Sequence, residues 1–183
     1  MKTPREKRKG ISSFRTYNRN RNRTVYLFRD IDEDSSQEII EELEELDTDK
    51  KKRPITIRIS SPGGLCSYGF AVVDTIEKLK CPTKAVAMGD VCSMAPLVFV
   101  ACDERIIYKH SFIMLHPVFG GAEGDPRFML SRVKNTAQSE KMYDDYFLSK
   151  TTMPKRTYMK HRTKELWLTA EEAVKYGIAH KIL

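Results

Sequence analysis

Residues 83–102 read TKAVAMGDVCSMAPLVFVAC, and the topology of the chain can be worked out from this stretch. Its first part, residues 83–88, predicts a short buried strand, and the run from Ser93 to about Cys102 predicts an apolar helix. Gly89 follows the strand and predicts a turn. Ser93 is therefore a polar residue at a strand–helix junction between apolar segments. A serine in this place is most often a helix N-cap, and the alternative is a nucleophile.

The alternation of strand and helix continues on both sides of this stretch. Ser35-Ser36-Gln37-Glu38 resembles a capping box that opens a helix, and Pro126 predicts the start of a long helix. Thr169 is expected to cap a short helix that Gly177 stops. This order predicts an α/β fold with a mainly parallel sheet. The expected strands are residues 24–28, 55–59, 83–88, 105–108, 112–115, a short one at Trp167 and 178–183, and the expected helices are 35–46, 66–79, 93–102, 126–150 and 170–176.

The positive charge is concentrated at the N-terminus. The chain has 183 residues and a net charge of +7, and residues 1–23 alone contain nine Lys or Arg against one Glu, which is +8. Such an arm can bind nucleic acid or an acidic partner, but no aromatic or glycine pattern accompanies it, so a solvated terminus without a nucleic-acid partner is expected. Residues 24–183 are expected to form one domain.

The cysteines and the hydropathy pattern exclude several classes of protein. Cys66, Cys81, Cys92 and Cys102 form no C-x-x-C pair and no cluster with histidines, so neither a metal site nor a disulfide framework is expected. The N-terminus has no apolar signal-like region, and no run is long enough to span a membrane. We therefore expect a cytoplasmic protein with no metal and no cofactor.

The residues around Ser93 supply most parts of a serine hydrolase. His116 follows the apolar run 112–115 and can act as the base that removes the hydroxyl proton of Ser93. Gly63 and Gly64 let the backbone approach a substrate, and the amide of Met94 is a further donor for an oxyanion. No G-x-S-x-G elbow is present, so the α/β-hydrolase fold is not indicated.

Several segments, in matching order, resemble the Clp protease proteolytic subunit family (ClpP), and the resemblance covers about residues 11–183. The segments are Ser60-Ser61-Pro62-Gly63-Gly64, Met88-Gly89-x-x-x-Ser93-Met94, Met114-Leu115-His116-Pro117, Gly120-Gly121-x-x-Gly124 and Trp167-Leu168-Thr169-Ala170-Glu171-Glu172-Ala173-x-x-Tyr176-Gly177.

The resemblance implies a fold, a site and an assembly. The fold would be a ClpP/crotonase-like spiral of βαβ units, with a protruding strand–helix handle at about residues 117–150. The site would be a nucleophile, a base, two oxyanion-hole amides and substrate-binding glycines: Ser93, His116, Gly64 with Met94, and Gly63 with Gly120 and Gly121. The protein would be a serine endopeptidase that cleaves peptides or loosely folded proteins inside a homo-oligomeric ring, a heptamer or a double-ring tetradecamer.

The chain departs from the family pattern at the third catalytic position. The family's triad aspartate corresponds to Glu165, a carboxylate that is one methylene longer. Glu165 is expected to orient His116, and its alternative is a surface charge paired with Lys164 or Arg162. His161 and Asp144 or Asp145 are the other residues that could take the orienting role.

A second departure concerns partners. Three aromatic positions of the surface cleft with which the family docks an AAA+ unfoldase become Thr56, Arg58 and Lys78, while Val86 stays apolar. A cation in place of an aromatic residue removes buried apolar area, so the usual docking is disfavoured. This pattern fits a phage capsid or scaffold maturation protease that works without an unfoldase. The alternatives of other classes are an inactive structural ring subunit and a crotonase-type acyl-CoA enzyme.

Overall fold

The computed structural model describes residues 22–183, except for the side chain of Arg162. The expected basic arm, residues 1–23, thus lies outside the described residues apart from its last two positions. Arg23 is buried, and its guanidinium donates to the carbonyl oxygens of Leu46 (3.0 Å) and Arg53 (2.8 Å). It also lies 3.6 Å from a carboxylate oxygen of Asp49. Arg23 is therefore anchored in the folded part of the chain.

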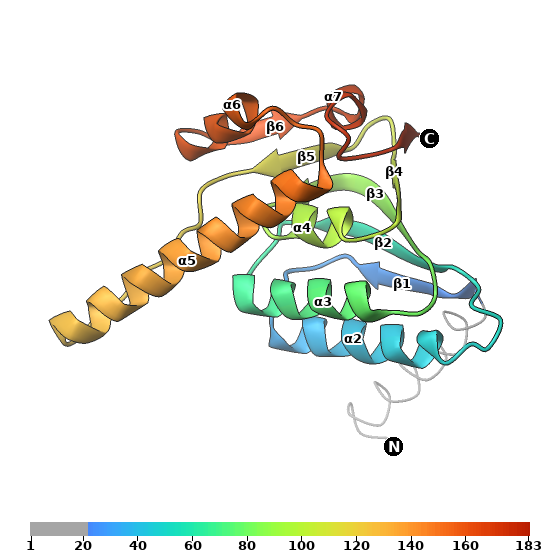
Figure 1. Cartoon of the computed structure of the whole chain (residues 1–183), viewed down its shortest axis with the longest axis horizontal. Helices are drawn as coiled ribbons and strands as arrows, with labels where there is room; N and C mark the ends of the chain where they lie inside the picture. Colours follow the sequence, from blue (N-terminus) through green and yellow to red (C-terminus); the bar gives the residue numbers. More distant parts are fainter. Residues whose placement is uncertain (1–21) are drawn as a thin grey trace, which may run out of the picture.

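A seven-stranded sheet forms the centre of the molecule (Figure 1). Its main path is β1-β2-β3-β4-β7, and β5 pairs with both β3 and β6. All of these pairs are parallel except β5 with β6, so the predicted α/β fold with a mainly parallel sheet is confirmed. The strands are β1 (Thr24–Leu27), β2 (Ile55–Ser61), β3 (Thr83–Cys92), β4 (Glu104–Ile107), β5 (Phe112–Leu115), β6 (Leu166–Leu168) and β7 (Lys181–Ile182).

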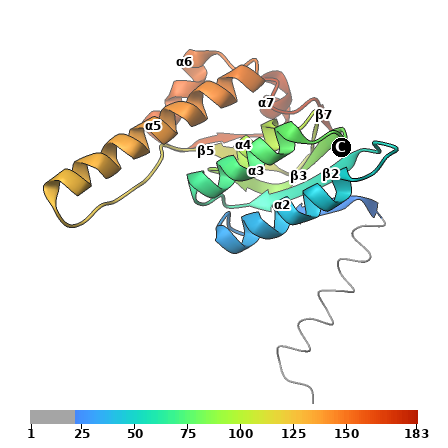
Figure 2. The ribbon, with the colours of Figure 1, turned by 60° about the horizontal axis from the view of Figure 1, so that its bottom comes forward.

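Three helices pack beside one another against the sheet, and a fourth extends away from it. Figures 1 and 2 show α2 and α3 side by side with α4 next to α3, while the first half of α5 protrudes from the body. The short helices α6, η1 and α7 lie around β6. The helices are α2 (Glu33–Asp47), α3 (Cys66–Lys78), α4 (Ala95–Val100), α5 (Pro126–Lys150), α6 (Lys155–Tyr158), the 3₁₀ helix η1 (Met159–Arg162) and α7 (Ala170–Lys175).

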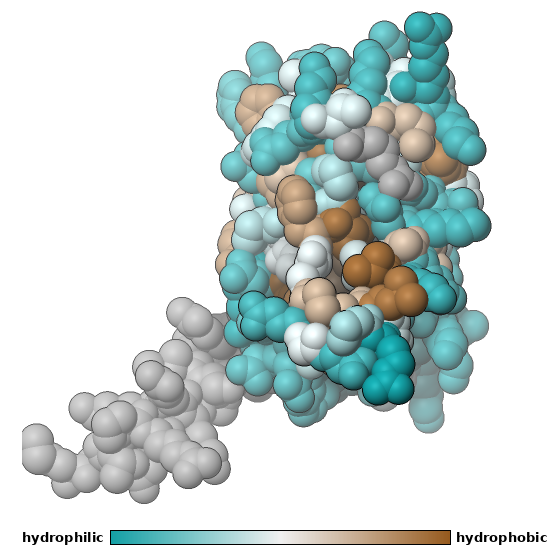
Figure 3. Space-filling view, turned by 90° about the vertical axis from the view of Figure 1, so that its left-hand side faces the viewer, coloured by the Kyte–Doolittle hydropathy of each residue, from teal (hydrophilic) through white to brown (hydrophobic). Residues whose placement is uncertain are grey.

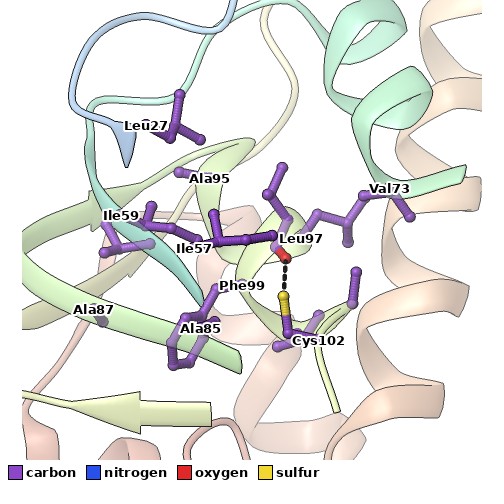
Figure 4. Packing of buried hydrophobic residues seen from close by; sticks show 14 of the residues in the cluster. Leu27, Ile57, Ile59, Val73, Ala85, Ala87, Ala95, Leu97, Phe99 and Cys102 are labelled. Carbon is purple, nitrogen blue, oxygen red and sulfur yellow. Dashed lines mark hydrogen bonds between the residues drawn. The ribbon is translucent and has the colours of Figure 1, made fainter. Parts of the chain in front are cut away.

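The core lies between the sheet and these helices. β2 alternates buried and half-buried residues, and its three isoleucines, Ile55, Ile57 and Ile59, have no exposed surface. Ile57 and Ile59 belong to one buried cluster with Leu97 and Phe99 of α4, and Ile57 points toward Leu97 in Figure 4. Each such side chain contributes about 1.5–3 kcal/mol to folding, as an upper bound. α4 has to be apolar throughout because all six of its residues are buried.

The helix boundaries confirm some sequence signals and correct one. α5 begins at Pro126 and Thr169 caps α7, as expected; the structure adds that Asp125 caps α5 and that Glu172 completes a capping box with Thr169. The expected capping box at Ser35–Glu38 is wrong. α2 begins two residues earlier, because the Asp32 side chain accepts from the Ser35 amide and the Ser35 hydroxyl accepts from the Asp32 amide. An Asp-x-x-Ser box satisfies the same two backbone N–H groups at the start of a helix as a Ser-x-x-Glu box does.

The interpretation of Ser93 as an N-cap is wrong. β3 does not stop at residue 88 but continues through Gly89, whose φ of 63° is open to glycine, to Cys92. α4 then begins at Ala95, and the side chain of its N-cap Met94 makes no capping hydrogen bond. Ser93 stands in the turn between them, so its hydroxyl is not used to cap the helix.

The expected handle corresponds to α5 and the segment before it. Residues 116–125 have no regular secondary structure in this single chain, so only the helical part of the handle is formed. The free end of α5 carries several exposed apolar side chains, and Figure 3, which looks at the molecule from that side, shows apolar surface there. They are Phe128 (50% exposed), Met129 (39%), Leu130 (55%) and Val133 (62%).

Candidate active site

Ser93 is held in a strained backbone conformation. Its φ is +58°, in the left-handed region that a non-glycine residue adopts at a cost of order 1–3 kcal/mol. Two hydrogen bonds hold the residue there. Its amide donates to the carbonyl of Met114 on β5 (2.9 Å), and its own carbonyl accepts from the hydroxyl of Tyr143 on α5 (2.7 Å). The turn directs the half-buried side chain into a cavity instead of toward the helix.

The glycine pair packs directly against this turn. A Cβ on Gly63, whose φ is +93°, would lie 2.5 Å from the Cβ of Ser93 and 2.7 Å from the nitrogen of Met94. Gly64, with φ +152°, is bridged to Ile31, where a Cβ would meet a carbonyl oxygen at 2.2 Å. Only glycine allows these contacts. Within residues 22–183, no hydrogen bond occupies the amides of Gly64 and Met94, so both can donate to a substrate oxygen.

His116 enters the same cavity from the end of β5. Its Nδ1 lies 2.6 Å from the carbonyl oxygen of Pro117, so this nitrogen carries the proton and donates it. The ring stacks on Phe119, with centroids 4.8 Å apart and planes 20° apart. Nε2 is then the nitrogen with a free lone pair, which is the form a general base requires.

One cavity of about 230 Å³ brings four of the expected site residues together. Ser93, His116, Gly64 and Met94 all line it. Its walls also include Tyr143, Asp144 and His161. The sequence gives no sign of Tyr143 here, and it offers Asp144 and His161 only as alternatives to Glu165.

Glu165 and His116 each adjoin the last residue pair of the β5–β6 ladder. β5 and β6 pair antiparallel with Leu115 opposite Leu166, and one further step of this register, beyond both strands, would set Glu165 opposite His116. Such cross-strand neighbours have Cβ atoms about 4.5–5.5 Å apart. The exposed carboxylate instead accepts a 2.8 Å hydrogen bond from the indole of Trp167. This position in the chain suits an acid that orients His116, but the Glu165 carboxylate points toward Trp167 instead.

Gly120 and Gly121 line a neighbouring pocket. This second pocket, of about 290 Å³, lies between the segment before α5 and α5 itself. Val118 and Glu140 border both pockets, so the two adjoin. A Cβ on Gly120 would contact Thr136, whereas one on Gly121 would meet nothing within 4 Å. The two glycines thus lie next to the Ser93 cavity and not in it.

The two thiols nearest to Ser93 are poor nucleophiles. Burial, together with the charges of Asp90 and Glu165, raises the pKa of the Cys92 thiol to about 11. Burial likewise raises the pKa of Cys66, which lines the cavity. The thiolate is the reactive form of cysteine, so neither residue competes with Ser93 near neutral pH.

The residues at the altered docking positions lie on the outward side of the sheet and on α3. Thr56 and Arg58 are half-buried on β2, Lys78 is exposed at the end of α3, and Val86 is buried. Arg58 is in register with Tyr26 on β1, so a cation stands beside an exposed aromatic ring. The surface is therefore less apolar than an aromatic cleft.

Residues 22–183 contain no group of three or more His, Cys, Asp or Glu side chains placed to hold a metal ion. In the same residues, no helix has the length and hydropathy that crossing a membrane requires.

A mainly parallel α/β sheet that presents a serine, a histidine and a glycine-lined backbone to one cavity has the parts of a serine hydrolase. A family model for Clp protease matches residues 8–183. An ATP-dependent Clp protease proteolytic subunit of Oltmannsiellopsis viridis is 30% identical over 169 residues, which are 91% of this chain and 87% of that protein. The chain belongs to the Clp protease family and is a serine-type peptidase of that fold.

Proposed function

We propose that this peptidase is an endopeptidase that cleaves peptides and loosely folded proteins through an acyl-enzyme on Ser93. The observation that carries the proposal is the single cavity lined by Ser93, His116, Gly64 and Met94. A nucleophile, a base and two backbone donors around one space are the minimum for acyl transfer.

Each residue has a defined step in this mechanism. The Ser93 hydroxyl attacks the scissile carbonyl carbon while Nε2 of His116 takes its proton. The amides of Gly64 and Met94 donate to the oxyanion that forms. His116 then gives the proton to the leaving amine, and a water molecule, activated in the same way, releases the acyl group from Ser93 and restores the hydroxyl.

The third member of the triad is Glu165, after a rotation of its side chain. In the present conformation the carbonyl of Pro117 accepts from Nδ1 of His116. A carbonyl fixes the ring tautomer but stabilises the imidazolium less than a carboxylate does. Turning Glu165 from Trp167 toward His116 would supply that charge, and this role is supported by the β5–β6 register, which ends at the pair Leu115–Leu166 directly before His116 and after Glu165.

The working form is a homo-oligomeric ring, as is general for Clp protease subunits. The exposed apolar side chains at the end of α5 and the protrusion of this helix support burial between subunits (Figure 3). A heptamer or a double-ring tetradecamer is the proposed assembly, with residues 1–23 as an arm of a single domain formed by residues 24–183. Substrate-binding backbone includes Gly63, Gly120 and Gly121.

A second candidate is favoured by the cations at Arg58 and Lys78. It is a protease that matures a phage capsid or scaffold and works without an AAA+ unfoldase. Degradation of casein, with and without ATP and the host unfoldase, distinguishes the two. Clear stimulation by the unfoldase contradicts the second candidate.

Labelling with a fluorophosphonate tests the main proposal. The assembled wild-type protein should take one label per subunit at Ser93, and Ser93→Ala should take none. A folded, assembled wild type that stays unlabelled contradicts the proposal and supports an inactive structural subunit. Binding of acyl-CoA in place of the label would support a crotonase-type enzyme.

A further inference from the structure

The helix α2 presents an acidic face of which the described residues neutralise only a part. It contains eight Asp or Glu and no Lys, Arg or His. It is the outermost of the three packed helices, beside α3, so one of its sides faces away from the body (Figures 1 and 2). Glu38 pairs with Arg29 on this side. Four further exposed carboxylates have no Lys or Arg in contact among residues 22–183, and they are Glu33, Asp34, Glu41 and Glu44.

This charge pattern opposes the stability of α2 itself. Glu41 and Glu44 lie three positions apart on one side of the helix, where like charges repel. Glu44 also stands in the last turn, where the helix dipole favours a cation, and that turn contains no basic residue. A cationic segment from outside the helix would therefore stabilise it.

One cation of the N-terminal arm already binds this helix. Arg23, the last residue of the arm, is buried, and its guanidinium donates a 3.0 Å hydrogen bond to the carbonyl of Leu46 in the last turn of α2. A positive charge is favourable at this end of a helix. The arm thus enters the folded part of the chain at the C-terminal end of α2.

The rest of the arm has the charge and the length to cover the acidic face. Residues 1–21 contain eight Lys or Arg and one acid, Glu6, which is +7. The 15 residues of α2 extend over about 22 Å, and seven extended residues span about 23 Å, so a third of the arm reaches from one end of α2 to the other. A single surface ion pair contributes little. Here any cation of the arm can pair with any carboxylate, so several pairs form without a fixed register.

We propose that the basic arm, residues 1–21, docks on the acidic face of α2 in its own chain and is held there by ion pairs. The attachment at Arg23 favours the arm of the same chain, because it keeps the arm at a high local concentration next to α2. In this position the cations of the arm are paired within the chain and are withheld from nucleic acid and other acidic partners. This inference does not depend on the proposed function.

The experiment measures how fast trypsin cleaves within residues 1–21 of the assembled full-length protein, read by mass spectrometry. Each rate is divided by that of a free peptide of the same sequence, which corrects for the response of trypsin to salt. Wild type should be cleaved roughly fivefold or more slowly at about 50 mM salt than at about 0.5 M salt, because salt screens the ion pairs. The double variant Glu41→Gln/Glu44→Gln should be cleaved at the faster rate at both salt concentrations. It should fold, since both residues are exposed and their replacement relieves repulsion within α2.

The double variant Glu123→Gln/Glu171→Gln is the matched control. It loses the same charge at two exposed positions outside α2 and should keep the protection of wild type. Protection that is independent of salt overturns the inference, as does equal protection in the α2 variant and the control.

Carbodiimide coupling of lysine amines to carboxylates identifies the chain on which the arm lies. In assemblies mixed from ¹⁵N-labelled and unlabelled chains, links from the lysines of the arm to Glu41 or Glu44 should join segments of a single isotope. The lysines are Lys2, Lys7 and Lys9. Links of mixed isotope would place the arm on α2 of a second copy and overturn docking within the chain.

Discussion

The hydroxyl of Tyr143 donates a 2.7 Å hydrogen bond to the main-chain carbonyl of Ser93. Tyr143 lies in α5, the helix that protrudes from the body, and its residue is only 8% exposed. The bond holds a backbone segment whose φ of +58° is unfavourable for serine. The position of α5 and the geometry of the nucleophile are therefore linked through a single phenol.

Replacing Tyr143 by phenylalanine should lower kcat by roughly fivefold with little change in KM. The substitution keeps the ring that stacks on Phe147 and removes only the hydroxyl, which is worth about 1 kcal/mol. Steady-state kinetics on one peptide checks this. Tyr146→Phe is the control, because that hydroxyl donates to Glu77 instead of Ser93. Equal kcat values in the two variants would show that the phenol does not position Ser93.

The strain at Ser93 predicts opposite effects on stability and activity. Ser93→Gly should raise the free energy of unfolding by roughly 1 kcal/mol relative to Ser93→Ala, because glycine adopts φ +58° without steric conflict. Both variants should be inactive. Urea unfolding of the two proteins, at one protein concentration, measures the difference. If alanine is as stable as glycine at this position, the backbone there is not strained.

Glu165 and Trp167 provide a test of the triad. Glu165→Gln should lower turnover by about 10²-fold or more, because a triad member acts as a unit with the other two. Trp167→Phe should raise turnover by roughly fivefold, since it removes the indole N–H that holds the carboxylate and keeps an aromatic ring against Phe112. Peptide turnover measures both effects. Unchanged turnover in Glu165→Gln would move the orienting role to another acceptor, such as the Pro117 carbonyl.

The parts of the structure that the sequence predicted well are those with local causes. Pro126 and Thr169 mark helix starts because such signals depend on residues only a few positions apart. The close backbone approach expected at Gly63 is also local in cause, since a Cβ there would collide with the Ser93 turn; that Gly63 and Gly64 serve a catalytic site stays a prediction. The parallel sheet followed from the alternation of strand and helix.

The parts that the sequence did not predict depend on contacts between distant residues. Nothing local distinguishes Tyr143 from any helical tyrosine, and its partner Ser93 is 50 positions away. The strand register can place Glu165 beside His116, but the direction of its carboxylate depends on the indole of Trp167. Asp144 and His161 belong to the cavity only because α5 and η1 meet there.

Gly63→Ala should prevent formation of the active site. The added Cβ would lie 2.5 Å from the Cβ of Ser93 and 2.6 Å from the carbonyl oxygen of Cys92, and φ is +93°. We expect a loss of about 2 kcal/mol or more of stability and no fluorophosphonate label. Gly89→Ala is the control: φ is +63°, but the nearest atom would be 3.4 Å away. This variant should lose about 1 kcal/mol and keep its label. Labelling of Gly63→Ala at the wild-type rate would contradict the packing argument.

His180 gives the fold a pH dependence. Desolvation of its ring and the positive charge of Arg105 lower the pKa of His180 below its usual 6.5. Nδ1 accepts from the backbone N–H of Arg105, and Nε2 lies 2.8 Å from a guanidinium nitrogen of the same residue. A neutral ring can accept at only one of these nitrogens, so a second proton would remove that acceptor and place a positive charge beside the guanidinium.

The sign of the effect follows from which state binds the proton more readily. The unfolded chain protonates His180 near pH 6.5, whereas the folded chain resists protonation, so this contribution to stability is present above pH 6.5 and is lost as the pH falls below it. The residue is exposed overall, so solvent screens part of the interaction and the effect is small. Between pH 7.5 and 5.5, the Tm of wild type should fall by roughly 1–3 °C more than that of His180→Gln. His110→Gln, which alters an exposed histidine, should follow wild type. If His180→Gln has the wild-type pH dependence, the pair with Arg105 does not destabilise the protonated form.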